Sequence, residues 1–257
     1  MSKFDMTILP INDDQDDYKL KRELSPNIPD VRKGSLTIIV GSVRSGKTVY
    51  MNSLIFNPNF YYGIFDNIHY ISPSVMNDDS CKYIRQACNC HEHYDDSIIE
   101  NIERFQSSFP NKNKRPSCMI VADDIINEVG MNSRMFGLCT RYRHLSRCIM
   151  VVIMTQKFRK ISPVCRANAS DYVLMSGIYN KKEQEAIADE IADYFRMTPK
   201  EFIAFYMKHT KEPYSFLYIQ MRTGLIFKNH DNVIYDRANR VNNDTDDSGS
   251  EYSEYDV

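Results

Sequence analysis

The stretch Ser35–Phe56, SLTIIVGSVRSGKTVYMNSLIF, decides the fold. Its first six residues, Ser35–Val40, are mostly apolar and β-branched and predict a short strand. Lys47–Phe56 predicts a helix, and the segment between them has the pattern G-x-x-x-x-G-K-T. Glycines let such a loop wrap tightly, so that successive backbone N–H groups point at one anion, and the helix N-terminus points at the same place. The stretch therefore predicts a phosphate-binding loop between a strand and a helix.

We expect this loop to bind the phosphates of ATP. Lys47 is expected to reach the β- and γ-phosphates, and the Thr48 hydroxyl to ligate Mg²⁺. The full set of predicted nucleotide-binding residues is Gly41, Ser42, Val43, Arg44, Ser45, Gly46, Lys47, Thr48 and Val49.

Strand-like and helix-like segments alternate along the rest of the chain. The strands have continuous rather than alternating apolar content, which favours a mostly parallel sheet covered by helices on both faces. Expected strands are Asn67–Ile71, Ser117–Ala122, Cys148–Met154 and Asp171–Met175, and expected helices are Ser80–Ala87, Ile98–Ser107, Asn132–Leu145, Lys181–Phe195 and one after Thr198 that ends near Lys208. Tyr214–Gln220 and Leu225–Lys228 predict a hairpin at an edge of the sheet. The fold class is α/β.

The apolar run Cys118–Ala122 is followed directly by two carboxylates, Asp123 and Asp124. A buried strand that ends in two acids delivers them to the ligand crevice of an open α/β sheet. We expect Asp123 to hold Mg²⁺ and Asp124 to polarise the attacking water; the alternative for Asp124 is a cap on the following helix. A second acid favours hydrolysis over phosphate transfer by a kinase.

The next predicted strand ends in Thr155-Gln156. Gln156 is expected beside the two aspartates, where an amide can sense the γ-phosphate or position the water. The competing interpretation is a surface glutamine at a strand exit.

The net charge of −2, from 32 basic and 34 acidic residues, conceals a segregation of charge. Residues 242–257 hold six acids and no base, so residues 1–241 carry 32 − 28 = +4. The segment from Val129 to Ser170 has eight Lys or Arg and no acid. This pattern predicts an anion-facing surface and an acidic tail.

Three arginines of the basic segment are candidates for completing the site from a neighbouring subunit: Arg141, Arg143 and Arg166. An arginine in this role stabilises the charge of the transition state. The alternative for each is a solvated basic face or a contact with DNA phosphate.

Taken together, GSVRSGKT, IVADDI, a strand ending in TQ, RYRHL upstream of it and a Pro-x-x-Arg-x-Asn segment downstream resemble the genome-packaging ATPases of large DNA viruses and virophages. These poxvirus-type enzymes are part of the FtsK–HerA superfamily. The resemblance covers about residues 35–176 and implies a RecA-like P-loop core. It also implies a homo-oligomeric ring, a pentamer or a hexamer, that drives double-stranded DNA into a preformed capsid through a capsid or portal-vertex partner.

Three alternatives share the phosphate-binding loop. A nucleoside or nucleotide kinase would not need Gln156, and a helicase or repair motor on the same core would separate strands. A nucleotide-regulated scaffold for capsid assembly would tolerate Asp124→Asn.

The chain is expected to have three parts: a polar N-terminal arm (1–30), the P-loop ATPase domain (31–241) and a disordered acidic tail (242–257). The seven cysteines are scattered, and we find no signal peptide and no apolar run long enough to span a bilayer. We therefore expect a soluble protein without a membrane partner. Its expected location is the host cytoplasm, in the virus factory, and also the virion. The segment CKYIRQACNCHEH, from Cys81 to His93, suits zinc by composition but lacks a paired C-x-x-C spacing.

Overall fold

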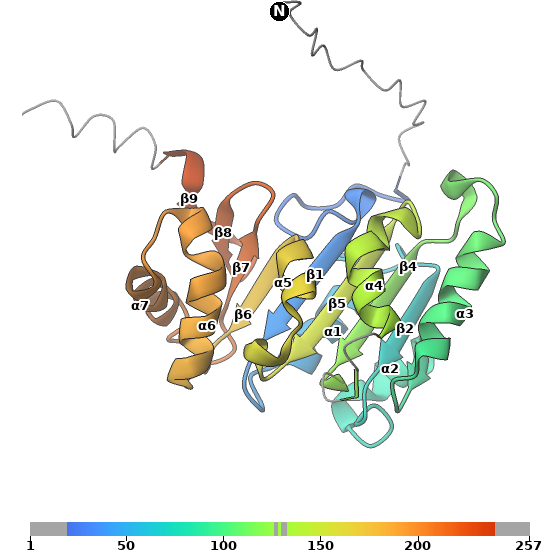
Figure 1. The fold of residues 1–257 in the computed structure, drawn as a ribbon, viewed down its shortest axis with the longest axis horizontal. Helices are drawn as coiled ribbons and strands as arrows, with labels where there is room; N and C mark the ends of the chain where they lie inside the picture. Colours follow the sequence, from blue (N-terminus) through green and yellow to red (C-terminus); the bar gives the residue numbers. More distant parts are fainter. Residues whose placement is uncertain (1–19, 126–127, 130–132, 240–257) are drawn as a thin grey trace, which may run out of the picture.

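A central sheet organises the protein, whose computed structural model describes residues 20–125, 128–129 and 133–239. In the described residues the sheet has nine strands in the order β3-β2-β4-β5-β1-β6-β7-β8-β9. Figure 1 shows β1 in the middle, with β5, β4 and β2 on one side and β6 and β7 on the other. The strands are β1 Ser35–Val40, β2 Asn67–Ile71, β3 Asn89–His91, β4 Cys118–Asp123, β5 Ile149–Thr155, β6 Asp171–Met175, β7 Phe216–Gln220, β8 Leu225–Lys228 and β9 Asn232–Asp236.

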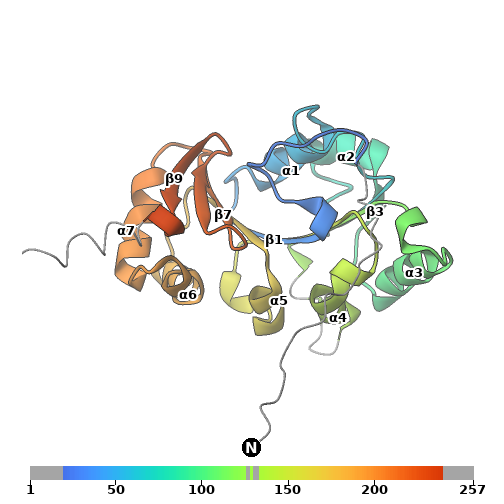
Figure 2. The same ribbon diagram turned by 90° about the horizontal axis from the view of Figure 1, so that it is seen from above.

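The first six strands of the chain, β1 to β6, are parallel, and β7, β8 and β9 extend the sheet in antiparallel fashion beyond β6. Helices cover both faces, as Figure 2 shows: α1 and α2 lie on one face and α3, α4, α5 and α6 on the other. The helices are α1 Lys47–Phe56, α2 Lys82–Ala87, α3 Asp96–Ser107, α4 Arg134–Arg141, α5 Pro163–Asn168, α6 Lys181–Ile191 and α7 Pro199–His209.

Successive residues of the central strands pack into two separate cores. In β5, Val151 and Ile153 join the core under α3 to α7, whereas Val152 and Met154 join the core under α1 and α2. All residues of β1, β4, β5 and β6 are buried. Burial on both faces explains why these strands are continuously apolar in sequence, because side chains alternate between the two faces.

The predicted α/β architecture, the parallel core and the C-terminal hairpin are confirmed. The sequence did not predict β3, β9 and α5. β3 has only three residues, and β9 is exposed or half-buried, so neither carries a clear apolar pattern. α5 has six residues and begins at Pro163 after a Ser162 cap. These elements are too short or too polar for periodicity to reveal them.

The described part of the expected N-terminal arm packs on the domain. Ile28 is 2% exposed and Tyr61 donates a hydrogen bond to the Pro29 carbonyl at 2.7 Å. On the other side, the Gln220 amide donates to the Pro26 carbonyl at 2.9 Å. Residues 1–19 and the acidic tail lie outside the described residues, so the three-part division stays a prediction. Within the described residues, no helix combines the length and apolar character needed to span a bilayer.

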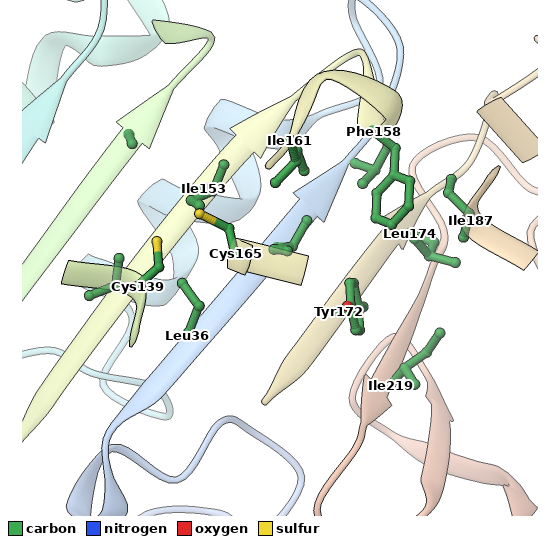
Figure 3. Close-up of a cluster of buried hydrophobic side chains, with 14 of the residues drawn as sticks. Leu36, Cys139, Ile153, Phe158, Ile161, Cys165, Tyr172, Leu174, Ile187 and Ile219 are labelled. Carbon is green, nitrogen blue, oxygen red and sulfur yellow. The ribbon is translucent and has the colours of Figure 1, made fainter. Parts of the chain in front are cut away.

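Phe158 links the end of β5 to the core that Figure 3 shows. Its side chain is fully buried, with the ring centroid 6.3 Å from that of Tyr172 on β6 and 5.2 Å from the guanidinium of Arg166 on α5. It lies two residues after Gln156, so it anchors the segment that leaves the carboxyl end of β5.

Phe158→Ala should lower the free energy of unfolding by about 3–5 kcal/mol, because it removes a fully buried ring and leaves a cavity. Urea denaturation measures the change. The matched control is Phe105→Ala, whose ring is 48% exposed and whose loss should change stability by about 0.5 kcal/mol. Equal effects of the two variants would contradict this assignment.

Candidate nucleotide-binding site

Strand register brings the predicted site residues to one edge of the sheet. Val40, the last residue of β1, is paired with Thr155 of β5, and Met154 of β5 is paired with Asp123 of β4. Each of these strands therefore ends at the same level. The phosphate-binding loop, Gln156 and the Asp123–Asp124 pair consequently lie together at the carboxyl edge of the sheet.

The phosphate-binding loop is packed so closely that two of its positions need glycine. A Cβ at Gly41 would lie 2.3 Å from Oγ of Ser45 and 2.8 Å from Cβ of Met175. Gly46, which caps the N-terminus of α1, has φ +94°, a left-handed conformation that glycine adopts without strain. The glycine spacing in the sequence is thus explained by packing and backbone geometry.

Lys47 is buried at the start of α1. Its ammonium group donates hydrogen bonds to the carbonyls of Gly41 at 2.9 Å and Ser42 at 3.2 Å. Burial lowers the pKa of Lys47, and the carboxylates of Asp124 and Asp123 oppose this shift. The lysine is therefore held in the loop, close to both acids, at the place where it is expected to meet phosphate oxygens.

Asp123 is only 6% exposed at the end of β4. Its Oδ2 accepts hydrogen bonds from the hydroxyls of Tyr70 and Ser72, each at 3.2 Å. Burial, reinforced by the neighbouring Asp124 carboxylate, raises the pKa of Asp123 to about 6, against the lowering effect of Lys47 and the two hydroxyls. A carboxylate this difficult to ionise is stabilised by a cation beside it.

Asp124 and Gln156 meet, as the sequence predicts. The Gln156 amide donates a hydrogen bond to Oδ2 of Asp124 at 2.8 Å. Asp124 has φ +52°, and its backbone N–H donates to the Met154 carbonyl at 3.0 Å. Left-handed backbone is uncommon outside glycine and marks a residue that its surroundings hold in place. Gln156 is also exposed where the chain leaves β5, so its role at the γ-phosphate stays a prediction.

The donor set at this edge fits Mg²⁺ bound together with phosphate. Among the described residues, the buried hydroxyl of Ser45 has no hydrogen-bond partner. Such an orphaned oxygen suits a ligand that supplies the missing contact. Mg²⁺ prefers one or two protein oxygens plus substrate phosphates, and the Asp123 carboxylate and the Thr48 hydroxyl are of that kind.

Tyr70 and Ser72 are site residues that sequence reasoning missed. Both stand at the carboxyl end of β2, which pairs with β4, with Ile71 opposite Ala122. The signal in the sequence was the polar residue directly after the predicted strand Asn67–Ile71. That signal needed the strand order, because only the position of β2 beside β4 brings Ser72 to Asp123.

The basic segment is acid-free in sequence but partly neutralised in space. Arg141 pairs with Glu103 of α3 at 2.9 Å, and Arg134 pairs with the same carboxylate at 3.0 Å. Arg166 pairs with Glu190 of α6 at 3.0 Å. Arg143 stacks on the ring of Tyr142 and, among the described residues, has no acidic partner. Within the described residues, neither Arg141 nor Arg166 forms an ion pair with Asp123.

The remaining loop residues are placed at the surface of the site. Val43, Arg44 and Val49 are exposed, and the hydroxyl of Ser42 donates to the carbonyl of Gly177. For the zinc question raised by Cys81 to His93, the described part of the chain contains no group of three or more His, Cys, Asp or Glu that could hold a metal ion.

The family model described as Poxvirus A32 protein matches residues 32–247. The chain belongs to this family. The resemblance to poxvirus-type packaging ATPases is thereby confirmed, and with it the class of the enzyme, an ATP hydrolase with the P-loop fold. No curated protein matches the chain in sequence.

Solved structures similar to this A32-family chain share its fold. B204, the DNA-packaging ATPase from Sulfolobus Turreted Icosahedral Virus, has a TM-score of 0.53 and 14% identity over 76% of this chain and 96% of its own. B204 from Sulfolobus turreted icosahedral virus 2 in complex with ATP-gammaS has a TM-score of 0.53 and 15% identity over 76% and 96%. The cytoplasmic domain of the Thermomonospora curvata Type VII Secretion ATPase EccC has a TM-score of 0.53 and 14% identity. The match covers 78% of this chain and 24% of the EccC chain.

Asp123→Asn should stabilise the ligand-free protein increasingly as pH rises. Asp123 ionises near pH 3.8 in the unfolded chain and near 6 in the folded protein, so wild-type stability falls between these values and stays lower above them. The variant does not ionise there. Its free energy of unfolding relative to wild type should rise by about 2–3 kcal/mol from pH 4 to pH 7, measured by urea denaturation.

The same substitution at exposed Asp189 is the control. If the free energies of unfolding of wild type and Asp123→Asn differ by the same amount at every pH, the pKa of Asp123 is not raised in the folded protein.

Proposed function

We propose that the protein is an ATP-driven motor that moves double-stranded viral DNA into a preformed capsid, working as a homo-oligomeric ring. The single observation that carries this proposal is the Asp124–Gln156 hydrogen bond at 2.8 Å beside the buried Lys47, in a chain of the poxvirus A32 family. It combines a hydrolytic carboxylate with an amide that can report the state of the γ-phosphate. A nucleotide kinase has no use for this pair.

Each side chain has a distinct part in ATP hydrolysis. Lys47 exchanges the carbonyls of Gly41 and Ser42 for phosphate oxygens, which carry more negative charge. Asp123 and Thr48 would hold Mg²⁺, which supplies charge neutralisation to the phosphates. Asp124 accepts a hydrogen bond from the attacking water and orients it.

Gln156 links the chemistry to movement. Its amide hydrogen bond to Asp124 must adjust when that carboxylate engages water at the γ-phosphate. The next residues, Lys157 and Arg159, are exposed cations, and Phe158 between them is buried. The Arg159 backbone N–H is tied to Glu183 of α6 at 3.1 Å. We assign Lys157 and Arg159 to contacts with DNA phosphates, because they lie one and three residues after Gln156.

An arginine from a neighbouring subunit would complete the site. Arg143 is the first choice among the three predicted arginines, since Arg141 and Arg166 already pair with Glu103 and Glu190. Head-to-tail contacts between subunits generate a ring when the rotation closes, which places one subunit's arginine against the next subunit's site. A pentamer and a hexamer both satisfy this requirement.

Lys47→Ala should lower the ATPase rate by at least about 100-fold, because the charge that meets the phosphates is removed. Asp124→Asn should lower kcat by about 100-fold with little change in nucleotide affinity, because it removes the base and keeps the shape. Phosphate release is measured with Mg²⁺ present, with and without duplex DNA. A wild-type rate that duplex DNA does not raise at low salt would exclude the motor.

Lys157→Glu combined with Arg159→Glu should abolish the stimulation of ATPase by duplex DNA and leave the basal rate within about twofold, because the site itself is unchanged. Lys82→Glu, which reverses an exposed charge on α2, is the control and should keep the stimulation. Stimulation that survives the double variant would remove these residues from the DNA path.

Mixing subunits tests the arginine. Inactive Lys47→Ala subunits mixed with inactive Arg143→Ala subunits should recover part of the ATPase activity, since some interfaces then combine an intact site with an intact arginine. Arg141→Ala and Arg166→Ala are compared in the same way. Absence of rescue by all three mixtures would contradict an arginine acting across an interface.

A further inference from the structure

The strand order divides the nucleotide site into two sides. β5 and β4, which carry Gln156 and the two aspartates, lie on one side of β1. β6 and β7 lie on its other side, and the loop after β6 and the loop before β7 meet at the same carboxyl edge, where Met175 is paired with Phe216. The hydrolytic groups thus occupy one side of the phosphate-binding loop. The other side carries two tyrosines that the proposed hydrolysis does not use.

Tyr214 lies against the phosphate-binding loop. A Cβ at Gly46 would be 3.2 Å from Cδ1 of Tyr214, so the ring covers the backbone at the N-terminus of α1. The side chain is nevertheless 69% exposed, and the residue has φ +63°. A bulky residue in left-handed backbone is strained, and an exposed ring returns little folding energy for that strain. The fold itself gives no reason for a tyrosine here.

Tyr179 stands on the adjoining loop. It is 80% exposed, and its Cε2 would lie 3.6 Å from a Cβ at Gly177. The Gly177 carbonyl accepts the hydrogen bond from Ser42 of the phosphate-binding loop. The loop that presents Tyr179 is therefore attached directly to the loop that binds phosphate.

The two tyrosine-bearing loops are tied to each other and to the core. The Ser176 backbone N–H donates to the Ser215 carbonyl at 2.8 Å. The buried hydroxyl of Tyr206 on α7 donates to the Met175 carbonyl at 2.6 Å and accepts from the Ile178 N–H at 3.1 Å. Both tyrosines are thus presented by fixed backbone, which lowers the entropy lost when a ligand binds.

We propose that Tyr214, with Tyr179 as a second wall, stacks on the purine base of the bound nucleotide. This inference rests on the proposed function and assigns the part of the site that holds the nucleoside end. Phosphates over Lys47 with their reacting end toward Asp124 leave the opposite end on the β6–β7 side. Exposed aromatic faces bind nucleobases by stacking, and a purine offers a larger face than a pyrimidine.

The test compares two ligands that share phosphates and differ in the nucleoside: Mg²⁺-ATP and Mg²⁺-tripolyphosphate, titrated calorimetrically into the full chain. Tyr214→Ala should weaken ATP binding by about tenfold or more, because one stacking partner is lost, and leave tripolyphosphate binding unchanged. Tyr214→Phe should keep wild-type affinity for ATP. Tyr179→Ala should weaken ATP alone by a smaller factor, and CTP should bind wild type more weakly than ATP does.

Tyr62→Ala, which removes another exposed tyrosine, is the control and should bind both ligands as wild type does. Unchanged ATP affinity in either alanine variant would overturn the role given to that tyrosine. Equal losses for ATP and tripolyphosphate would also overturn it, since they would indicate a support for the phosphate-binding loop. Wild-type protein that binds neither ligand would overturn the proposed function itself, a result independent of both tyrosines.

Discussion

The register of three parallel strands is the constraint on which the site depends. Asp123 is level with Met154 and Thr155 with Val40, so the polar groups that follow β4, β5 and β1 converge without any long-range loop. A slip of one residue in β5 would exchange the side chains that face the two cores. Such an exchange would disrupt the close packing of both cores, one under α1 and α2 and the other under α3 to α7.

A second polar contact system holds the other side of the sheet. Asp171 on β6 accepts hydrogen bonds from Ser35 on β1 at 3.0 Å and from Tyr218 on β7 at 2.8 Å. Burial raises the pKa of Asp171, and the hydrogen bonds offset part of that cost. Gln220 donates to both Tyr218 and the Pro26 carbonyl, so the segment before β1 is joined to the antiparallel extension. The start of β1, the strand that leads into the phosphate-binding loop, is therefore held by these contacts with β6.

Local sequence predicted the parts of the site that local sequence determines. The β1–loop–α1 unit has its predicted bounds, and Asp124 meets Gln156 because each directly follows a buried strand. Tyr70 could not be found in this way, since its contact with Asp123 depends on which strands are neighbours. The free positive charge of the basic segment was overestimated for the same reason: Glu103 and Glu190 lie far from Arg141 and Arg166 in sequence and beside them in space. Strand order and ion pairing are tertiary properties that composition does not contain.

The two carbonyl contacts of Lys47 have a consequence for the order of events when a nucleotide arrives. The ammonium group already satisfies part of its hydrogen-bonding capacity within the loop, at Gly41 and Ser42. In the function proposed here, nucleotide binding exchanges these neutral oxygens for charged phosphate oxygens, and the free-energy gain is the difference between the two sets. A ligand with a single weakly charged oxygen gains little from this exchange, whereas a polyphosphate gains much. The hydrogen bonds of Lys47 within the loop would thus favour ligands of high negative charge.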